Sequence, residues 1–313
     1  MLGTTAAGLY WMFRQLERSE NIARLIDAGV RLALTNSSSE GDEWASIITT
    51  AGATDAFEAR HDGYNAERVI DFLLRDPQNP SSVLSLVEAA RANGRRVRTA
   101  LTREVWEATN DCAMTIRELF AQPITYQDLP RVLAIVRRES AFVIGAHHST
   151  MMRSEPFNFA RLGTFIERAD NTARILDVKY YVLLPTVSLV GSPLDNLQWE
   201  TILRSVAAQR AYRWARPDDV SASGIAEFVI LDERLPRSIA FCCHKITENL
   251  DWLAHRYGER HASQDLAQAM LQRVTERTID DIFDAGLHEF LAGCIGELAT
   301  IGHQIETDYR FVD

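Results

Sequence analysis

A charged helical segment near the start of the chain recurs in its middle. Residues 17–27 read Glu-Arg-Ser-Glu-Asn-Ile-Ala-Arg-Leu-Ile-Asp, and residues 167–177 read Glu-Arg-Ala-Asp-Asn-Thr-Ala-Arg-Ile-Leu-Asp. Six of the eleven positions are identical, and three of the others exchange similar residues. Two copies of one helix need equivalent surroundings, so this repeat constrains the fold of the whole chain.

A second pair of matching segments follows in the same order. Residues 72–83 and 228–239 carry Phe, Asp, Pro and Ser at the same spacing, and Asn93 and Asn249 follow at the same offset. Two collinear matches predict an internal duplication, with a first half at residues 1–127 and a second at 128–313. We expect the halves to pack as one compact unit with a pseudo-twofold relation, which would make the two motif helices neighbours.

Helical periodicity dominates the rest of the sequence. From Tyr10 to Leu34, apolar residues recur every three, four or seven positions, whereas few runs show the alternation of a half-buried strand. The 9 prolines and 16 glycines fall between long segments. Ser81 or Ser82 is placed to cap a helix that runs towards Phe120, and Pro130 and Pro156 stand at early helical positions, where proline is tolerated. The sequence therefore predicts an all-α multi-helix bundle of eight to ten helices.

The charge and the cysteine spacing restrict the setting of the protein. A net charge of −10 argues against nucleic acid as the partner. The most apolar stretches are too short or too charged at their edges to span a membrane, and the N-terminus does not resemble a signal peptide. The 4 cysteines show no disulfide framework in their spacing. We expect a cytoplasmic protein with neither a membrane nor a nucleic-acid partner.

The repeated helix carries a polar stripe between two apolar flanks. Glu17, Asn21 and Arg24 fall on one face of a 3.6-residue helix, with Glu20 and Asp27 just beside it, and Arg18 follows Glu17 in the motif. The second copy repeats the pattern with Glu167, Arg168, Asn171 and Arg174. A stripe between apolar flanks is at least partly buried, and buried charge must be paired or bound to a ligand.

Three interpretations of these stripes stay open at this point. In the first, the stripes flank a polar cavity, and these eight residues bind a small acidic or peptide substrate. In the second, the stripes are internal salt bridges of a non-catalytic structural module: i,i+4 pairs within each helix, plus Arg18 and Arg168 reaching carboxylates of the other helix.

The third interpretation is an enzyme. The acidic pairs at i,i+3 spacing resemble those that hold Mg²⁺ in all-helical phosphohydrolases. The ligands would then be Glu17, Glu20, Glu167 and Asp170. The arginine and asparagine beside each acid are not required by that chemistry.

Other candidate residues are weaker. His147 and His148 are adjacent, so they point in different directions on a helix, and a two-histidine metal site favours i,i+4 spacing. Cys242 and Cys243 are more typical of a core than of a nucleophile. The arginine run that begins at Arg91 and Arg95 indicates a solvated or partner-facing surface.

The chain resembles the bacterial alpha-E domain family, an all-helical domain with a Glu-Arg motif. The likeness rests on Leu9-Tyr10-Trp11 followed by the first motif, on residues 165–177 around the second motif, and on the closing residues 301–311. Met12-Phe13 departs from the small residue that is common there in the family. The resemblance covers essentially the whole chain.

The resemblance implies a setting rather than a reaction. Members of the family tend to occur beside, or fused to, an ATP-grasp ligase and a transglutaminase-like peptidase. It therefore suggests a helical component of an amide or peptide ligation or peptide-modification system, which binds a substrate or the ligase. It leaves open whether the protein is itself an enzyme.

Overall fold

The computed structural model describes residues 1–33, 41–182, 193–216 and 221–311. Within these ranges the chain forms fifteen α-helices, one 3₁₀-helix and no strand, so the predicted all-α class is confirmed. Eight to ten helices were expected, and that number is wrong because six short helices stand between the long ones. The long helices are α1 (Gly3–Ala33), α5 (Val83–Arg96), α6 (Arg103–Leu119), α7 (Leu129–Thr150), α8 (Glu155–Val182), α9 (Pro193–Ser205), α12 (Ile239–Tyr257), α13 (Ala262–Thr275) and α15 (Leu287–Asp308).

The short helices connect the long ones. They are α2 (Asp42–Thr50), α3 (Thr54–Glu58), α4 (Ala66–Leu74), α10 (Gln209–Ala215), α11 (Ala222–Leu231) and α14 (Ile279–Ala285), with a 3₁₀ turn, η1 (Arg98–Ala100), between α5 and α6. Sequence signals account for many of the boundaries. The Ser82 and Ser238 hydroxyls accept hydrogen bonds from the free amides of the first turns of α5 and α12, and α12 ends at Gly258 in the left-handed conformation.

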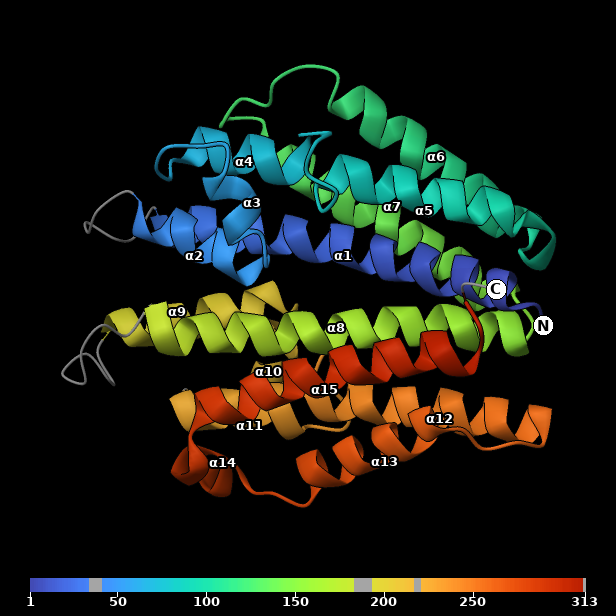
Figure 1. Cartoon of the computed structure of the whole chain (residues 1–313). Coiled ribbons are helices and arrows are strands. Elements are labelled where there is room, and N and C mark those ends of the chain that lie inside the picture. The colour runs from blue at the N-terminus through green and yellow to red at the C-terminus, as the bar shows by residue number, and fades with distance from the viewer. Residues whose placement is uncertain (34–40, 183–192, 217–220, 312–313) are drawn as a thin grey trace.

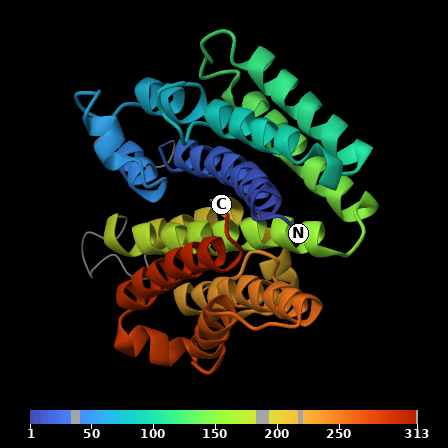
Figure 2. The same cartoon turned by 45° about the vertical axis from the view of Figure 1, so that its right-hand side comes forward.

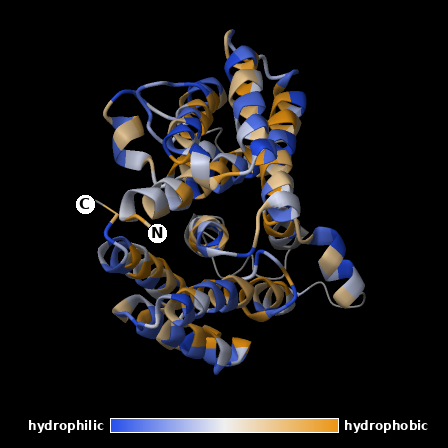
Figure 3. Ribbon diagram, turned by 90° about the vertical axis from the view of Figure 1, so that its right-hand side faces the viewer, coloured by the Kyte–Doolittle hydropathy of each residue, from blue (hydrophilic) through white to orange (hydrophobic). Residues whose placement is uncertain are grey.

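The two longest helices, α1 and α8, lie side by side at the centre and run in the same direction (Figures 1 and 2). Helices α2–α7 cover α1 on one side of the molecule, and α9–α15 cover α8 on the other. Hydrophobic and hydrophilic residues are mixed along the helices (Figure 3). Among the described residues, no helix is long and apolar enough to cross a membrane.

The packing around α1 is matched around α8. Helix α1 packs on α5 and α7, whereas α8 packs on α12 and α15. In addition α2, which follows α1 in the chain, contacts α8, and α9, which follows α8, contacts α1. The division at 127/128 remains a prediction; α7, which follows it, packs against α1 and α6.

Two hydrophobic cores flank the central helix pair, and both draw on α1 and α8. Met12 and Leu16 of α1 belong to the core beneath α2–α7, together with Ala160 of α8. Leu9 and Tyr10 of α1 belong instead to the core formed by α8–α15. Because α1 serves both cores, the polar face that it shares with α8 lies at the centre of the molecule.

Candidate functional site

The packing of α1 on α8 brings the two motifs together. Arg18 Nε lies 2.5 Å from Glu167 Oε1, and Arg168 Nη2 lies 2.8 Å from Glu17 Oε2. Each motif therefore supplies the arginine that neutralises the glutamate of the other. Glu17 is 0% exposed and Glu167 is 3% exposed, so both carboxylates depend on these partners.

Each glutamate also binds a second guanidinium, and here the two sides differ. Glu167 Oε2 accepts a bond of 3.0 Å from Arg14 Nε, which comes from α1 itself. Glu17 Oε1 lies 2.8 Å from Nη1 of Arg237, a buried residue in the turn before α12. Sequence reasoning missed Arg237, because a single arginine in a turn has no periodic pattern. The signal available was its position inside the second repeated segment.

The second acid of each motif makes the expected i,i+4 pair. Arg24 Nη2 lies 2.6 Å from Glu20 Oε1, and Arg174 Nε lies 2.7 Å from Asp170 Oδ2. Arg237 joins this set, since its Nη2 donates to Glu20 Oε1 at 2.9 Å. The salt-bridge network predicted from helical spacing is therefore present.

The network keeps its carboxylates ionised. Burial alone would raise the pKa of Glu17, but the guanidiniums of Arg168 and Arg237 outweigh it and hold the pKa at about 2. Burial opposes ionisation of Glu167 as well, yet Arg18 and Arg14 lower its pKa.

The cluster has more cations than anions. Its carboxylates are Glu17, Glu20, Glu167 and Asp170, and its guanidiniums are Arg14, Arg18, Arg24, Arg168, Arg174 and Arg237. With six cations against four anions, the cluster has a formal charge of +2 within a chain of net charge −10. Five of the six guanidiniums are partly exposed, so this excess of positive charge is accessible to a ligand and favours an anionic one.

A polar cavity of about 160 Å³ opens on one side of the α1–α8 pair. It lies between the motif helices and the end of α2, beside the turn before α5. Five of the eight residues predicted to bind substrate line it: Arg18, Asn21, Glu167, Asn171 and Arg174. Asp170 lines it as well. The other three, Glu17, Arg24 and Arg168, do not line it.

Asn21 is shared between the cavity and the network beside it. Its Oδ1 accepts a bond of 2.9 Å from Arg237 Nη1. Its Nδ2 is buried and has no hydrogen-bond partner in the described part of the chain. A buried amide donor without a partner is costly to the fold.

The acidic residues do not fit the Mg²⁺ site of the enzyme interpretation. Each of the four proposed ligands already accepts a hydrogen bond from at least one guanidinium, and a cation there would face arginine charge at close range. Within the described ranges, no three His, Cys, Asp or Glu side chains are grouped so that they could hold a metal ion.

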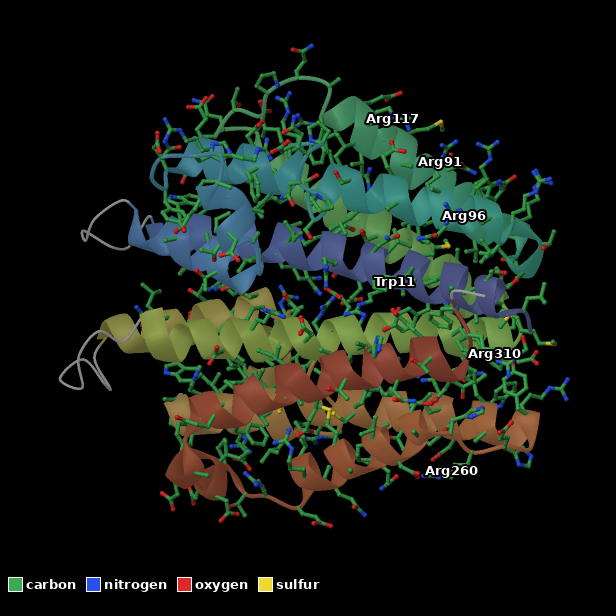
Figure 4. The ribbon with its side chains drawn as sticks, viewed as in Figure 1. Trp11, Arg91, Arg96, Arg117, Arg260 and Arg310 are labelled. Atoms are coloured by element: carbon green, nitrogen blue, oxygen red, sulfur yellow. The ribbon has the colours of Figure 1, made fainter. Side chains whose placement is uncertain are left out.

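The remaining candidates occupy structural positions. His147 stacks on Phe157, and burial, reinforced by the charges of His148 and Arg153, lowers its pKa to about 3. Burial raises the pKa of the Cys242 thiol to about 12, which leaves it protonated and poorly nucleophilic. Arg91 and Arg96 lie on α5, which packs against α1, and neither lines the cavity beside the motifs (Figure 4).

A comparison with known proteins finds a family that is described by this motif. A family model, Alpha-E, described as a predicted alpha-helical domain with a conserved ER motif, matches residues 1–309. Uncharacterized proteins of Mycobacterium bovis and of two strains of Mycobacterium tuberculosis are 22% identical over 94% of this chain. The chain spans about a third (35%) of the length of these relatives. No solved structure matches it at a significant level.

Proposed function

The chain belongs to the Alpha-E family, and from that premise we propose that its two ER motifs bind the acidic group of a small or peptide substrate. The cavity beside Arg18, Asn21 and Arg174 carries this proposal. Its volume of about 160 Å³ corresponds to roughly five water molecules at ~30 Å³ each, which suits a carboxylate- or phosphate-bearing group rather than a whole nucleotide.

The hydrogen-bonding inventory of the cavity supports an anion. The oxygens of Glu167 and Asp170 already accept bonds from Arg14, Arg18 and Arg174. A guanidinium has five N–H donors, so both arginines of the cavity keep donors for a ligand. These unused guanidinium donors beside carboxylates that are already paired form an arrangement that binds carboxylate or phosphate.

We assign the protein to an ATP-grasp-associated amide or peptide ligation or peptide-modification system in the cytoplasm. In this role it presents a substrate to an ATP-grasp ligase, with a transglutaminase-like peptidase as a further partner. The family resemblance is the basis for these partners. The relatives are consistent with such a role, because about two thirds of their length lies outside the matched part and has room for further domains.

We also propose that the fold arose by internal duplication and has a pseudo-twofold axis along the central helix pair. The reciprocal Arg18–Glu167 and Arg168–Glu17 pairs support it. So does the matched packing, in which α1 contacts α5, α7 and α9, and α8 contacts α12, α15 and α2. Under this proposal the two motifs provide two related sites, one on either side of the pair.

The second candidate function is a non-catalytic interaction module whose network serves the fold alone. The observation in its favour is that all four carboxylates of the network are paired with arginines. The two candidates differ at the cavity, since a purely structural network has no need of the excess positive charge there.

Titration calorimetry with inorganic phosphate and with glutarate tests the proposal. Arg174 lines the cavity, whereas Arg24 makes the same kind of i,i+4 pair away from it. We expect Arg174→Gln to weaken binding about tenfold or more, the scale of one charge-assisted hydrogen bond, and Arg24→Gln to leave it within about twofold. A preference between the probes would identify the acidic group.

Two outcomes would count against the proposal. Absence of binding of either probe by the unmodified protein favours the structural module. Equal effects of the two arginine substitutions would place the anion outside the cavity.

A further inference from the structure

Among the positions at which the two copies of the second repeated segment differ, one changes the surroundings of the α1–α8 pair. Matching residues 72–83 with 228–239 places Ser81 opposite Arg237. The two turns have the same local structure: Asp76 Oδ1 accepts a bond from the amide of Gln78, and Asp232 Oδ1 accepts one from the amide of Arg234. The next residue in each segment, Ser82 or Ser238, caps the following helix. The alignment of Ser81 with Arg237 therefore has a structural basis.

On one side, Arg237 fills the space beside the first motif. Its guanidinium lies 2.8 Å from Glu17 Oε1, 2.9 Å from Asn21 Oδ1 and 2.9 Å from Glu20 Oε1. The residue is 8% exposed. The chain thus supplies a permanent occupant for this side.

On the other side, Ser81 lines the cavity together with Asp170 and Asn171, the counterparts of Glu20 and Asn21. The serine side chain consists of one carbon and a hydroxyl group, so it does not fill the space that an arginine would take. Glu167 receives its second guanidinium from Arg14 instead, so its negative charge is balanced without an arginine at the position that corresponds to Arg237. The counterpart of Arg14 in the second motif is Thr164, which explains why the two sides are balanced differently.

We infer that the cavity is the open copy of the site that Arg237 closes, and that Ser81 is the residue that keeps it open to a ligand. The inference rests on the proposed function for the nature of the ligand, an anionic group bound by Arg18 and Arg174. It adds the residue that decides which of the two sites can bind.

Substitution at position 81 tests the inference. Ser81→Arg places in the first half the residue that the second half has, and its guanidinium should fold into the cavity against Asp170 and Asn171. We expect it to lower the affinity for inorganic phosphate and glutarate at least tenfold. The control Ser149→Arg places the same side chain at an exposed position of α7 outside the cavity, and it should bind within about twofold of the unmodified protein. Circular dichroism confirms that both variants are folded.

A crystal structure of Ser81→Arg gives a readout that needs no ligand. A guanidinium bound to Asp170 and Asn171 would support the equivalence of the two sites even if the unmodified protein bound neither probe, in which case the proposed function alone would fail. A guanidinium pointing into solvent, or a Ser81→Arg variant that binds the probes as the unmodified protein does, would overturn the inference.

Discussion

At the scale of single residues, Glu17 shows how far a buried carboxylate depends on its partners. Its pKa of about 2 lies below the ordinary value of 4.5, although burial acts in the opposite direction. A carboxylate whose pKa is lowered on folding stabilises the protein above its unfolded pKa, and this stability is lost as the pH falls through the folded pKa. Glu17 should therefore contribute fully above about pH 5 and progressively less between pH 4.5 and pH 2.

We predict that Glu17→Gln lowers the free energy of unfolding at pH 7 by on the order of 3 kcal/mol, because Arg168 and Arg237 lose their anion. The difference from the unmodified protein should narrow as the pH falls from 4.5 towards 2. Urea unfolding across this range measures it. The exposed pair of Arg103 and Glu107 provides the control, since Glu107→Gln should have little effect at any pH. A pH-independent cost of Glu17→Gln would contradict the assignment.

At the scale of secondary-structure elements, the approach of α1 to α8 depends on Gly163. A Cβ atom at this position would lie 2.1 Å from the carbonyl oxygen of Tyr10, a backbone atom of the neighbouring helix. We predict that Gly163→Ala destabilises the protein by about 1–3 kcal/mol or more, because the helices must separate. Gly145, in α7, is the matched control: it is exposed and has nothing within 4 Å of the added carbon, so Gly145→Ala should stabilise by about 0.5–1 kcal/mol. Thermal unfolding of both variants checks the prediction, and similar effects would contradict it.

At the scale of the whole molecule, the interlocked cores argue against independent halves. Leu9 and Tyr10 of α1 pack in the core formed by α8–α15, and Ala160 of α8 packs in the core beneath α2–α7. We predict that fragments 1–127 and 128–313, expressed separately, show no cooperative thermal transition. We expect the same result for fragments 1–152 and 153–313, which divide the chain between α7 and α8. Circular dichroism melts against the full chain test this. A cooperative melt of an isolated fragment would show that the halves are separate domains.

The sequence was most informative where structure is local. Pro130, Pro156 and the pair Ser81 and Ser82 mark helix starts that the structure has, with Ser82 as the cap, and helical spacing predicts the pairs of Glu20 with Arg24 and of Asp170 with Arg174. The exchange of arginines between the motifs was anticipated as well, because two repeated helices that lie side by side can satisfy each other.

Apart from these pairs, the contacts that depend on tertiary packing could not be predicted. Arg237 reaches Glu17 across more than 200 residues of sequence, and no local pattern marks it. The location of the cavity depends on the end of α2 and on Ser81, which approach α8 only after folding. The short helices α2, α3 and α4 were not predicted, since segments of five to nine residues carry little periodicity.

The reciprocal pairing of Arg18 with Glu167 and of Arg168 with Glu17 has the form of an isologous interface, in which two subunits contribute the same residues to each other. In a homodimer, one mutation alters both copies of such an interface at once. In a single continuous chain each copy can change alone. Arg237 can then stabilise the fold on one side of the helix pair, while Ser81 leaves the equivalent site on the other side open to a ligand. Two identical subunits could not separate these two roles, because each substitution would appear in both sites.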